Sequence, residues 1–387
     1  MERIYLDHNA TTPIDQGVLN AMLPYLQDNF GNASSIHQEG QVAKMALNQA
    51  RKEVADYLNA EAAEIVFTSC GTESDNMALI GIYDQFYKKG NHIITTEVEH
   101  SAVIRSCEYV EARGAKITYL KVNRDGLLDL EEFEKSFTDK TVLVSVMFAN
   151  NEIGVIYPIK KMAEIAHKKG ALFHTDAVQA VGKMKVDVKD LNVDLLSLSG
   201  HKIYAPKGVG ALYIKKGIPC LSVVKGGTQE KGRRGGTENL ASIVGLGKAM
   251  LRLVSEQEKD NHKIKKLRDH FEKAILQTIP YTFLNGAQEP RVANTSNICF
   301  KGVEGEGVIL SLDLKGISAS SGSACSSGAI EPSRVLLAMG RTKEEAGASV
   351  RFSFGKSNTE EQVNRVLEIL SPTIEKLRTY SPISLKA

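Results

Sequence analysis

The chain has 387 residues, of which 42% are apolar and 24% are charged, as in an ordinary folded protein. Its 48 basic and 46 acidic residues leave a net charge of +2, so we expect neither direct nucleic-acid binding nor attachment to an anionic membrane. No apolar run approaches the roughly 20 residues that span a bilayer. Met1 to Tyr5 lead at once into polar sequence, so we expect neither insertion nor export. Five scattered cysteines without a C-x-x-C pair argue against a disulfide framework or a zinc site and favour a reducing, cytoplasmic location.

Short strands and helices alternate from the N-terminus onward. Arg3 to Leu6 predict a short strand, followed by a turn-forming run over residues 7–13. Apolar residues recur at helical spacing over residues 41–58, and Ile65 to Thr68 predict the next strand. This alternation is typical of an α/β fold.

The segment after that strand predicts an anion site. Ser69 to Ser74 join the strand to a helix expected over residues 75–88, so free backbone N–H groups and hydroxyls gather at a helix N-terminus. A phosphate monoester bound near Gly71 and Thr72 is the functional interpretation. The alternative is an ordinary helix cap by the side chain of Thr72 or Ser74.

Four more predicted strands, over residues 93–96, 142–148, 171–175 and 194–198, are each followed by polar residues. Helical patterns lie between most of them, so we expect parallel strands joined by right-handed crossovers. Parallel strands align their carboxyl ends, where open α/β sheets bind ligands. One edge of the sheet should therefore collect the following side chains: Thr72, His100, Asn151, Asp176, Gln179, His201 and Lys202.

Lys202 is the centre of this prediction, because it follows a strand and a small-residue turn directly. A lysine at this edge becomes an amine nucleophile once desolvation or neighbouring cations lower its pKa. A Schiff base to pyridoxal phosphate is the specific hypothesis, and an ordinary surface lysine is the alternative. The polar side chains that converge on the same edge favour the functional interpretation.

Residues 226–238 predict a mobile, basic, glycine-rich loop. One interpretation is a solvated linker. The other is a functional loop in which backbone amides, Arg233, Arg234 and Thr237 approach a phosphate or a carboxylate, either in the same subunit or in a neighbouring one.

The rest of the chain predicts a smaller α+β domain. A helix over residues 240–259 would connect the domains, and apolar residues over 264–275 predict another helix. Strand-like pieces follow at 295–300 and 350–354, and a T-x-x-Q capping box opens a C-terminal helix at Thr359. We therefore expect a large α/β domain over residues 13–255 and a small α+β domain formed by residues 1–12 and 256–387.

Two further residues of the small domain are candidates for chemistry. Cys325 lies in a serine-rich, glycine-containing segment over residues 318–328. Because no apolar neighbour could form a core around it, we expect an exposed and mobile thiol rather than a buried cysteine. Arg351 lies between apolar residues of a predicted strand and needs an anionic partner. That partner is either a structural carboxylate or the carboxylate of a substrate.

Together these motifs resemble those of the cysteine desulfurases of the NifS/IscS type, within the class-V aminotransferase family of fold-type I pyridoxal-phosphate enzymes. The likeness runs nearly end to end and is carried by Asn150 to Gly154, Ser199 to Lys202 and Ser321 to Cys325. The long serine-rich cysteine segment is similar to that of the first of the family's two groups. His8-Asn9-Ala10 stands where Asn-Ala-Ala is usual, and Gly236 stands where serine is frequent, which leaves the subfamily open.

The resemblance implies a large domain with pyridoxal phosphate at the carboxyl ends of a mainly parallel sheet, and a small domain that carries the catalytic Cys325. Lys202 would hold the cofactor as a Schiff base, and Asp176 would pair with its pyridinium nitrogen and keep the ring an effective electron sink. His100 would stack on the ring and transfer protons. The other implied contacts are Gly71, Thr72, Ser199, His201 and a Thr237 donated by the partner subunit of a homodimer at the phosphate, Asn151 and Gln179 at the ring oxygen, and Arg351 with Asn151 at the substrate carboxylate.

By the same resemblance, L-cysteine would lose its sulfur to Cys325 and leave as L-alanine, with Lys202 as the base at Cα. The persulfide would pass to an acceptor protein, such as an iron–sulfur scaffold, a tRNA-thiolation enzyme or a thiamin-pathway protein. An aminotransferase or selenocysteine lyase on the same scaffold is one alternative, because neither needs an essential thiol. A sulfur-relay scaffold that has lost catalysis is another.

Overall fold

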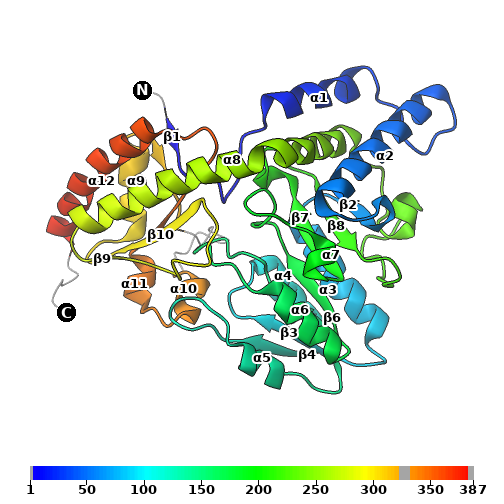
Figure 1. Cartoon of the computed structure of the whole chain (residues 1–387), viewed down its shortest axis with the longest axis horizontal. Coiled ribbons are helices and arrows are strands. Elements are labelled where there is room, and N and C mark those ends of the chain that lie inside the picture. The colour runs from blue at the N-terminus through cyan, green and yellow to red at the C-terminus, as the bar shows by residue number, and fades with distance from the viewer. Residues whose placement is uncertain (1–2, 322–331, 382–387) are drawn as a thin grey trace.

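The computed structural model describes residues 3–321 and 332–381, and its larger part is a seven-stranded sheet (Figure 1). Among the described strands of this sheet, β8 alone runs in the direction opposite to the other six, so the predicted α/β class with a mainly parallel sheet is confirmed. In spatial order the strands are β2 (Ile65–Thr68), β8 (Gly210–Ile214), β7 (Leu195–Ser199), β6 (Leu172–Asp176), β5 (Thr141–Ser145), β3 (His92–Thr96) and β4 (Lys116–Leu120).

Helices cover both faces of this sheet, because successive side chains of a strand point to opposite faces. On β7, Leu195 packs in the core with α3 and α4, whereas Leu196 packs in the core with α2, α6 and the first half of α8. Val66 and Phe67 of β2 divide in the same way. The helices of this part are α1 (Gln16–Gln27), α2 (Gln38–Leu58), α3 (Gly71–Phe86), α4 (Ser101–Glu111), α5 (Leu130–Lys135), α6 (Ile159–Lys168), α7 (Val188–Leu191) and the first half of α8 (Leu240–Thr278).

A second core belongs to a three-stranded antiparallel sheet in the order β12-β10-β9. The second half of α8, α9 and α12 pack on it. The N-terminal strand β1 pairs in parallel with β11, so the first residues of the chain join this smaller part. Its elements are β1 (Ile4–Tyr5), β9 (Thr282–Leu284), β10 (Thr295–Phe300), α9 (Gly305–Asp313), β11 (Ile317–Ser318), β12 (Ser349–Ser353) and α12 (Glu360–Tyr380). The short helices α10 (Arg334–Ala338) and α11 (Lys343–Gly347) precede β12 in the chain, and their buried apolar residues join the first core.

The helix α8 is one continuous element of 39 residues that extends from the larger part to the smaller part (Figure 1). The sequence predicted two helices here, and that prediction was wrong. The polar residues between 256 and 263 include no glycine or proline, and most are good helix formers, so nothing interrupts the helix. The predicted domain boundary at residues 255 and 256 falls inside α8, and the division into two domains stays a prediction.

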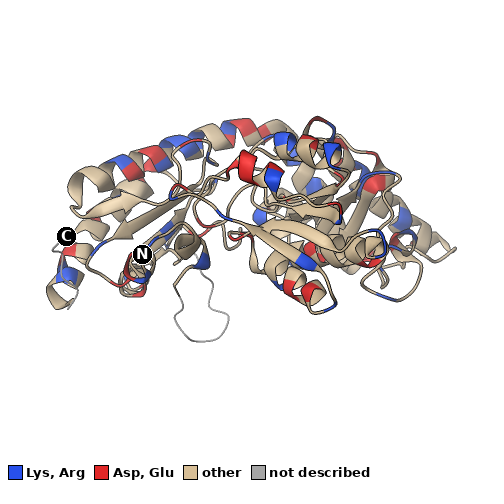
Figure 2. Cartoon of the chain, turned by 90° about the horizontal axis from the view of Figure 1, so that it is seen from below, with Lys and Arg blue, Asp and Glu red and all other residues tan. Residues whose placement is uncertain are grey.

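Three smaller differences concern helix ends and unpredicted elements. The helix α1 and the edge strand β4 were not predicted. Thr359 caps α12 by accepting a hydrogen bond from the Gln362 backbone, but the Gln362 side chain accepts from Asn358 rather than completing a capping box. Basic and acidic residues are interspersed along the helices, as the balanced net charge predicts (Figure 2). No helix of the described ranges is long and apolar enough to cross a membrane.

Replacing Phe271 tests the core of the smaller part. Phe271 is fully buried on α8, with its ring centroid 4.9 Å from that of Phe352 and 5.5 Å from that of Phe354. Because the lost ring leaves a cavity, we expect Phe271→Ala to lower the free energy of unfolding by about 3 to 5 kcal/mol in chemical denaturation. Leu276→Ala, at an exposed position of the same helix, should cost less than about 1 kcal/mol. Equal losses would contradict the packing described.

Candidate active site

The carboxyl ends of β2, β3, β5, β6 and β7 open into a cavity of about 890 Å³, a size typical of small-molecule sites. Thr237 is not in its lining, and Cys325 lies outside the described residues. The described residues on either side of Cys325, Ser321 and Pro332, both line the cavity. The remaining predicted site residues all line it: Gly71, Thr72, His100, Asn151, Asp176, Gln179, Ser199, His201, Lys202 and Arg351.

Lys202 lies at the end of a short 3-10 turn that follows β7 directly. Its Nζ donates hydrogen bonds to the backbone carbonyls of Asn9 and Ala10, both at 2.7 Å. Thr12 fixes the same turn, because its backbone N–H and its hydroxyl both donate to the carbonyl of His201. Burial, assisted by the positive charge of Arg351, lowers the pKa of Lys202 to about 8. Near neutral pH, a much larger share of this amine is therefore unprotonated than of an ordinary lysine.

Asp176 and His100 are two titratable side chains in the lining of the same cavity. Asp176 ends β6, and its Oδ1 accepts a hydrogen bond of 2.9 Å from the backbone of Val178. Burial raises the pKa of Asp176, while the neighbouring His100 and Lys202 act in the opposite direction. The Nδ1 of His100 accepts from the Ala102 backbone and caps α4, so the neutral ring carries its proton on Nε2. Burial also lowers the pKa of His100.

The N-terminus of α3 fits a phosphate group. The helix begins at Gly71, so Thr72 and Ser74 lie inside its first two turns, and the alternative that either caps the helix was wrong. Cys70 occupies the cap position without a capping side-chain bond, which leaves the first N–H groups to another acceptor. A Cβ on Gly71 would meet Val178 Cγ2 at 2.7 Å. Within the described ranges, the buried hydroxyl of Ser199 has no hydrogen-bond partner.

Arg351 has a structural carboxylate partner. From β12, its Nη2 donates to Asp7 at 2.8 Å and its Nη1 donates to the carbonyl of Asn151 at 3.0 Å. The buried Nε has no hydrogen-bond partner among the residues that the structure describes. Asn150, which precedes Asn151, fixes the loop over residues 150–153, because its Oδ1 accepts hydrogen bonds from the backbone N–H groups of Glu152 and Ile153. Arg351 thus satisfies the structural alternative and still lines the cavity.

The segment over residues 226–238 is tied to the larger part rather than loosely solvated. Glu230 is buried and forms a two-pronged ion pair with Arg51 at 2.6 Å. Arg234 pairs with Glu73 at 2.8 Å, and Arg233 donates to the backbone of Ile65. Both arginines thus have partners within their own chain, which the sequence pattern did not connect with this segment. Their approach to a phosphate or a carboxylate of a ligand stays a prediction.

Other residues of the cavity were missed by the sequence interpretation. Glu99 is buried and accepts hydrogen bonds from Thr96 and from the backbone of Met147, and burial raises its pKa to about 8. Cys70 brings a thiol into the lining, and Asn9 lies where the N-terminal segment meets Lys202. Only the clustering of turn formers around Asn9 gave a sequence signal, and it predicted a loop.

The amine of Lys202 should react as a free base at an unusually low pH. In the cofactor-free protein, we expect acetylation of Lys202 by acetic anhydride to reach half its limiting rate near pH 8, because only the unprotonated amine reacts. Peptide mass spectrometry across a pH series measures this rate. Free lysine in the same reaction is the control, with an ordinary side-chain pKa of about 10.4. A midpoint for Lys202 equal to that of the control would contradict the assignment.

The comparison with known proteins agrees with this geometry. The model of the family described as Aminotransferase class-V matches residues 4–366. A "Cysteine desulfurase IscS" from Methanosarcina thermophila is 50% identical over 383 residues, which are 99% of this chain and 95% of that protein.

Solved structures are similar over nearly the whole chain. One described as "NIFS-LIKE PROTEIN" has a TM-score of 0.91 and 36% identity, with 98% of this chain and 100% of that chain covered. "SspA in complex with cysteine" has a TM-score of 0.82 and 35% identity, with 92% and 100% covered. The likeness that the sequence motifs predicted is confirmed. The chain therefore belongs to the class-V aminotransferase family of pyridoxal-phosphate enzymes and, within that family, to the cysteine desulfurases of the NifS/IscS type.

Proposed function

We propose that the protein removes sulfur from L-cysteine, releases L-alanine and holds the sulfur as a persulfide on Cys325. The observation that carries the proposal is one cavity lined by the Lys202 amine, by Asp176 and by both described ends of the segment that contains Cys325. The amine has a pKa lowered to about 8, as required of a nucleophilic lysine. The named relatives support the substrate.

Pyridoxal phosphate is the proposed cofactor. When bound, it supplies an electron sink that makes the Cα and Cβ positions of the amino acid more acidic. Lys202 would hold it covalently, and Asp176 would hold its ring nitrogen. Asn151 and Gln179 would contact the ring oxygen. The phosphate would be held by the first turn of α3 at Gly71 and Thr72, with Ser199 and His201.

Lys202 and His100 would move the protons. The unprotonated amine of Lys202 takes a proton from Cα, and its position on the carbonyls of Asn9 and Ala10 keeps it at the edge of the cavity. His100 carries its neutral-form proton on Nε2, so this atom is the donor that the ring offers. Glu99, buried beside it, is hydrogen-bonded to the backbone and keeps the segment in place.

Arg351 would receive the carboxylate of L-cysteine. Its Nε is the donor left over when the other nitrogens bind Asp7 and Asn151. A carboxylate bound to this buried guanidinium forms a charge-assisted hydrogen bond of the stronger kind. Asn151 lies beside it in the cavity lining and would complete this subsite.

Cys325 would be the sulfur acceptor. It is four residues from Ser321, and four extended residues span at most roughly 14 Å, so its thiol is tethered to the cavity edge. Its thiolate attacks the substrate sulfur, so an S–S bond forms while the Cβ–S bond breaks. The electron pair of that bond stays on carbon, which gains a proton and becomes the methyl group of L-alanine.

A homodimer is proposed on the basis of two groups of exposed residues. Thr237 is exposed and absent from the cavity lining of its own chain, which fits a contribution to the site of a second subunit. Exposed large apolar side chains also occur along α1, α2 and their connection, and exposed apolar groups of this kind mark association surfaces. They are Leu23, Leu26, Phe30, Ile36 and Met45.

The persulfide would pass to an acceptor protein for iron–sulfur clusters, thio-cofactors or tRNA thiolation. An aminotransferase or a selenocysteine lyase would use the same lysine and aspartate without the thiol. A scaffold without catalysis would need neither, and the lowered pKa of the Lys202 amine disfavours it.

The cysteine assignment is tested by two alanine variants. We expect Cys325→Ala to keep the visible absorbance of the bound cofactor and to lose sulfide release from L-cysteine, because the nucleophile is gone. Cys70→Ala, which removes the thiol described in the cavity lining, should keep both. With isotope-labelled cysteine, mass spectrometry should find the labelled sulfur on the Cys325 peptide. Sulfide release that survives in Cys325→Ala would leave the aminotransferase or lyase function instead.

The role of Arg351 is separated from its ion pair by a second pair of variants. We expect Arg351→Met to raise the KM for L-cysteine by about ten- to a hundredfold, the value of one charged hydrogen bond. Asp7→Asn breaks the same ion pair but leaves the guanidinium in place, so its KM should change by less than about threefold. Steady-state kinetics measures both values. Equal increases would mean that Arg351 acts only as the partner of Asp7.

A further inference from the structure

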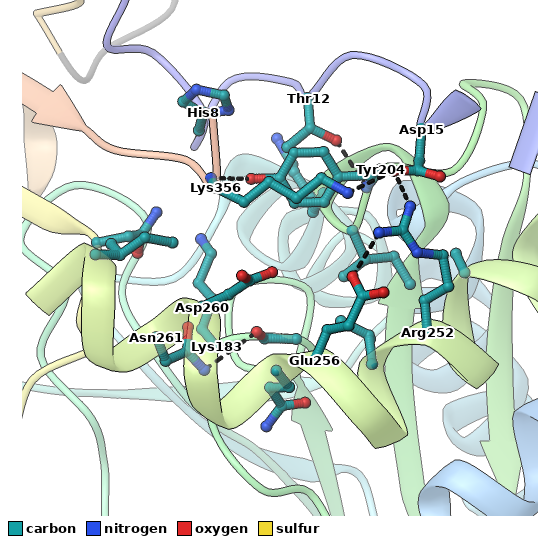
Figure 3. Close-up of a pocket in the computed structure, with 18 of the residues that line it drawn as sticks. His8, Thr12, Asp15, Lys183, Tyr204, Arg252, Glu256, Asp260, Asn261 and Lys356 are labelled. Carbon is teal, nitrogen blue, oxygen red and sulfur yellow. Dashed lines mark hydrogen bonds and ion pairs between the residues drawn. The ribbon is translucent and has the colours of Figure 1, made fainter. Parts of the chain in front are cut away.

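A second, smaller cavity approaches Lys202 from the side of α8 (Figure 3). Its volume of about 50 Å³ is enough for one or two water molecules and too small for a substrate. Lys202 is the one described residue that lines both cavities. Lys183 also lines the smaller cavity, near Asp260 and Asn261 of α8. The smaller cavity therefore places a second lysine behind the reactive one.

Lys183 is linked to Lys202 through a single residue. Its Nζ donates to Asn9 Oδ1 at 2.7 Å and to the side-chain oxygen of Gln179. The backbone carbonyl of Asn9 accepts from Gln179 Nε2 at 3.0 Å and from Lys202 Nζ at 2.7 Å. Asn9 thus contacts both lysines, one through its side chain and the other through its main chain.

Lys183 and Asn9 together orient the amide of Gln179. The carbonyl of Asn9 can only accept, so the amide nitrogen faces Asn9, and the amide oxygen accepts from Lys183. Without Lys183, the oxygen loses its donor and the carbonyl of Asn9 alone holds the amide. The other bonds of Asn9 fix its position against Asn151, Asn294, Thr295 and Ser353.

A charged residue at this place costs energy. Burial lowers the pKa of Lys183, and the positive charges of Lys202 and Arg351 lower it further. Other titratable groups also surround Lys202, namely Asp7, His100, Asp176 and His201. A purely structural link between Gln179 and Asn9 needs only a neutral donor such as an amide. A lysine amine, whose charged form is disfavoured at this place, therefore indicates a role in the site.

We propose that Lys183 is a positioning residue of the active site, which orients the Gln179 amide and, through Asn9, holds the amine of Lys202 in place. The inference rests on the proposed function, because the step it assists is the reaction of the Lys202 amine with the carbonyl of pyridoxal phosphate. In that step the nitrogen forms a C=N bond and the carbonyl oxygen leaves as water.

Lys183→Met keeps the length of the side chain and removes its donors. We expect the Schiff base to form about tenfold more slowly when pyridoxal phosphate is added to the cofactor-free protein, because a displaced reactant loses rate steeply. Stopped-flow absorbance measures this rate without any sulfur chemistry. For sulfide release, kcat should fall about tenfold, while the KM for L-cysteine stays within about twofold.

Two controls make the result decisive. Lys183→Arg keeps a donor at this position, and the small cavity beside it offers space for the larger group, so it should recover both rates to within about threefold of the unaltered protein. Lys185→Met, at an exposed lysine two positions later, should change neither rate. If Lys183→Met does not fold, Lys183→Leu, which also lacks a donor, replaces it in the same measurements with the same expected losses.

The outcomes separate this inference from the proposed function. A normal rate of Schiff-base formation in Lys183→Met overturns the positioning role, whatever the sulfur chemistry. Equal losses in the methionine and arginine variants, together with a lower unfolding temperature in both, also overturn it in favour of a structural role. Failure of the unaltered protein to release sulfide, with normal Schiff-base formation, overturns the proposed function alone.

Discussion

The position of the reactive amine depends on the hydrogen bonds that Lys202 donates to the carbonyls of Asn9 and Ala10, which lie more than 190 positions earlier in the chain. The strand β7 delivers the lysine to the edge of the sheet, and the N-terminal segment closes over it. Burial between these two elements lowers the pKa of the amine, because the charged form loses its contact with water. The lowered pKa of Lys202 therefore depends on the packing of the N-terminal segment against the end of β7.

The same N-terminal segment joins the two cores. β1 pairs with β11 of the smaller part, and Asp7 pairs with Arg351 on β12. Two residues later, Asn9 contacts Gln179 and Lys202 of the larger part. A substrate held between Arg351 and Lys202 would thus bridge elements that this short segment already holds in register, together with the continuous helix α8.

Much of the site could be predicted from sequence, because parallel strands bring their carboxyl ends to one edge wherever they lie in the chain. Asp176 and Lys202 follow from this rule alone. Asn9, Glu99 and the pair of Glu230 with Arg51 do not, since no local pattern relates residues that meet only through tertiary packing. The continuity of α8 was missed for a related reason: a change of its buried face resembles a break in helical periodicity.

The ionisable groups of the cavity have their pKa values shifted toward neutral forms in both directions. Burial lowers the pKa of His100 and Lys202 and raises that of Asp176 and Glu99. The charged forms of these groups are disfavoured in the cavity, and a ligand that brings complementary charges would stabilise them. The proposed cofactor and substrate have this pattern, with a ring nitrogen for Asp176, a phosphate for the helix end and Ser199, and a carboxylate for Arg351. Because these contacts lie on different elements, a bound cofactor and substrate would hold those elements together, as the N-terminal segment already does.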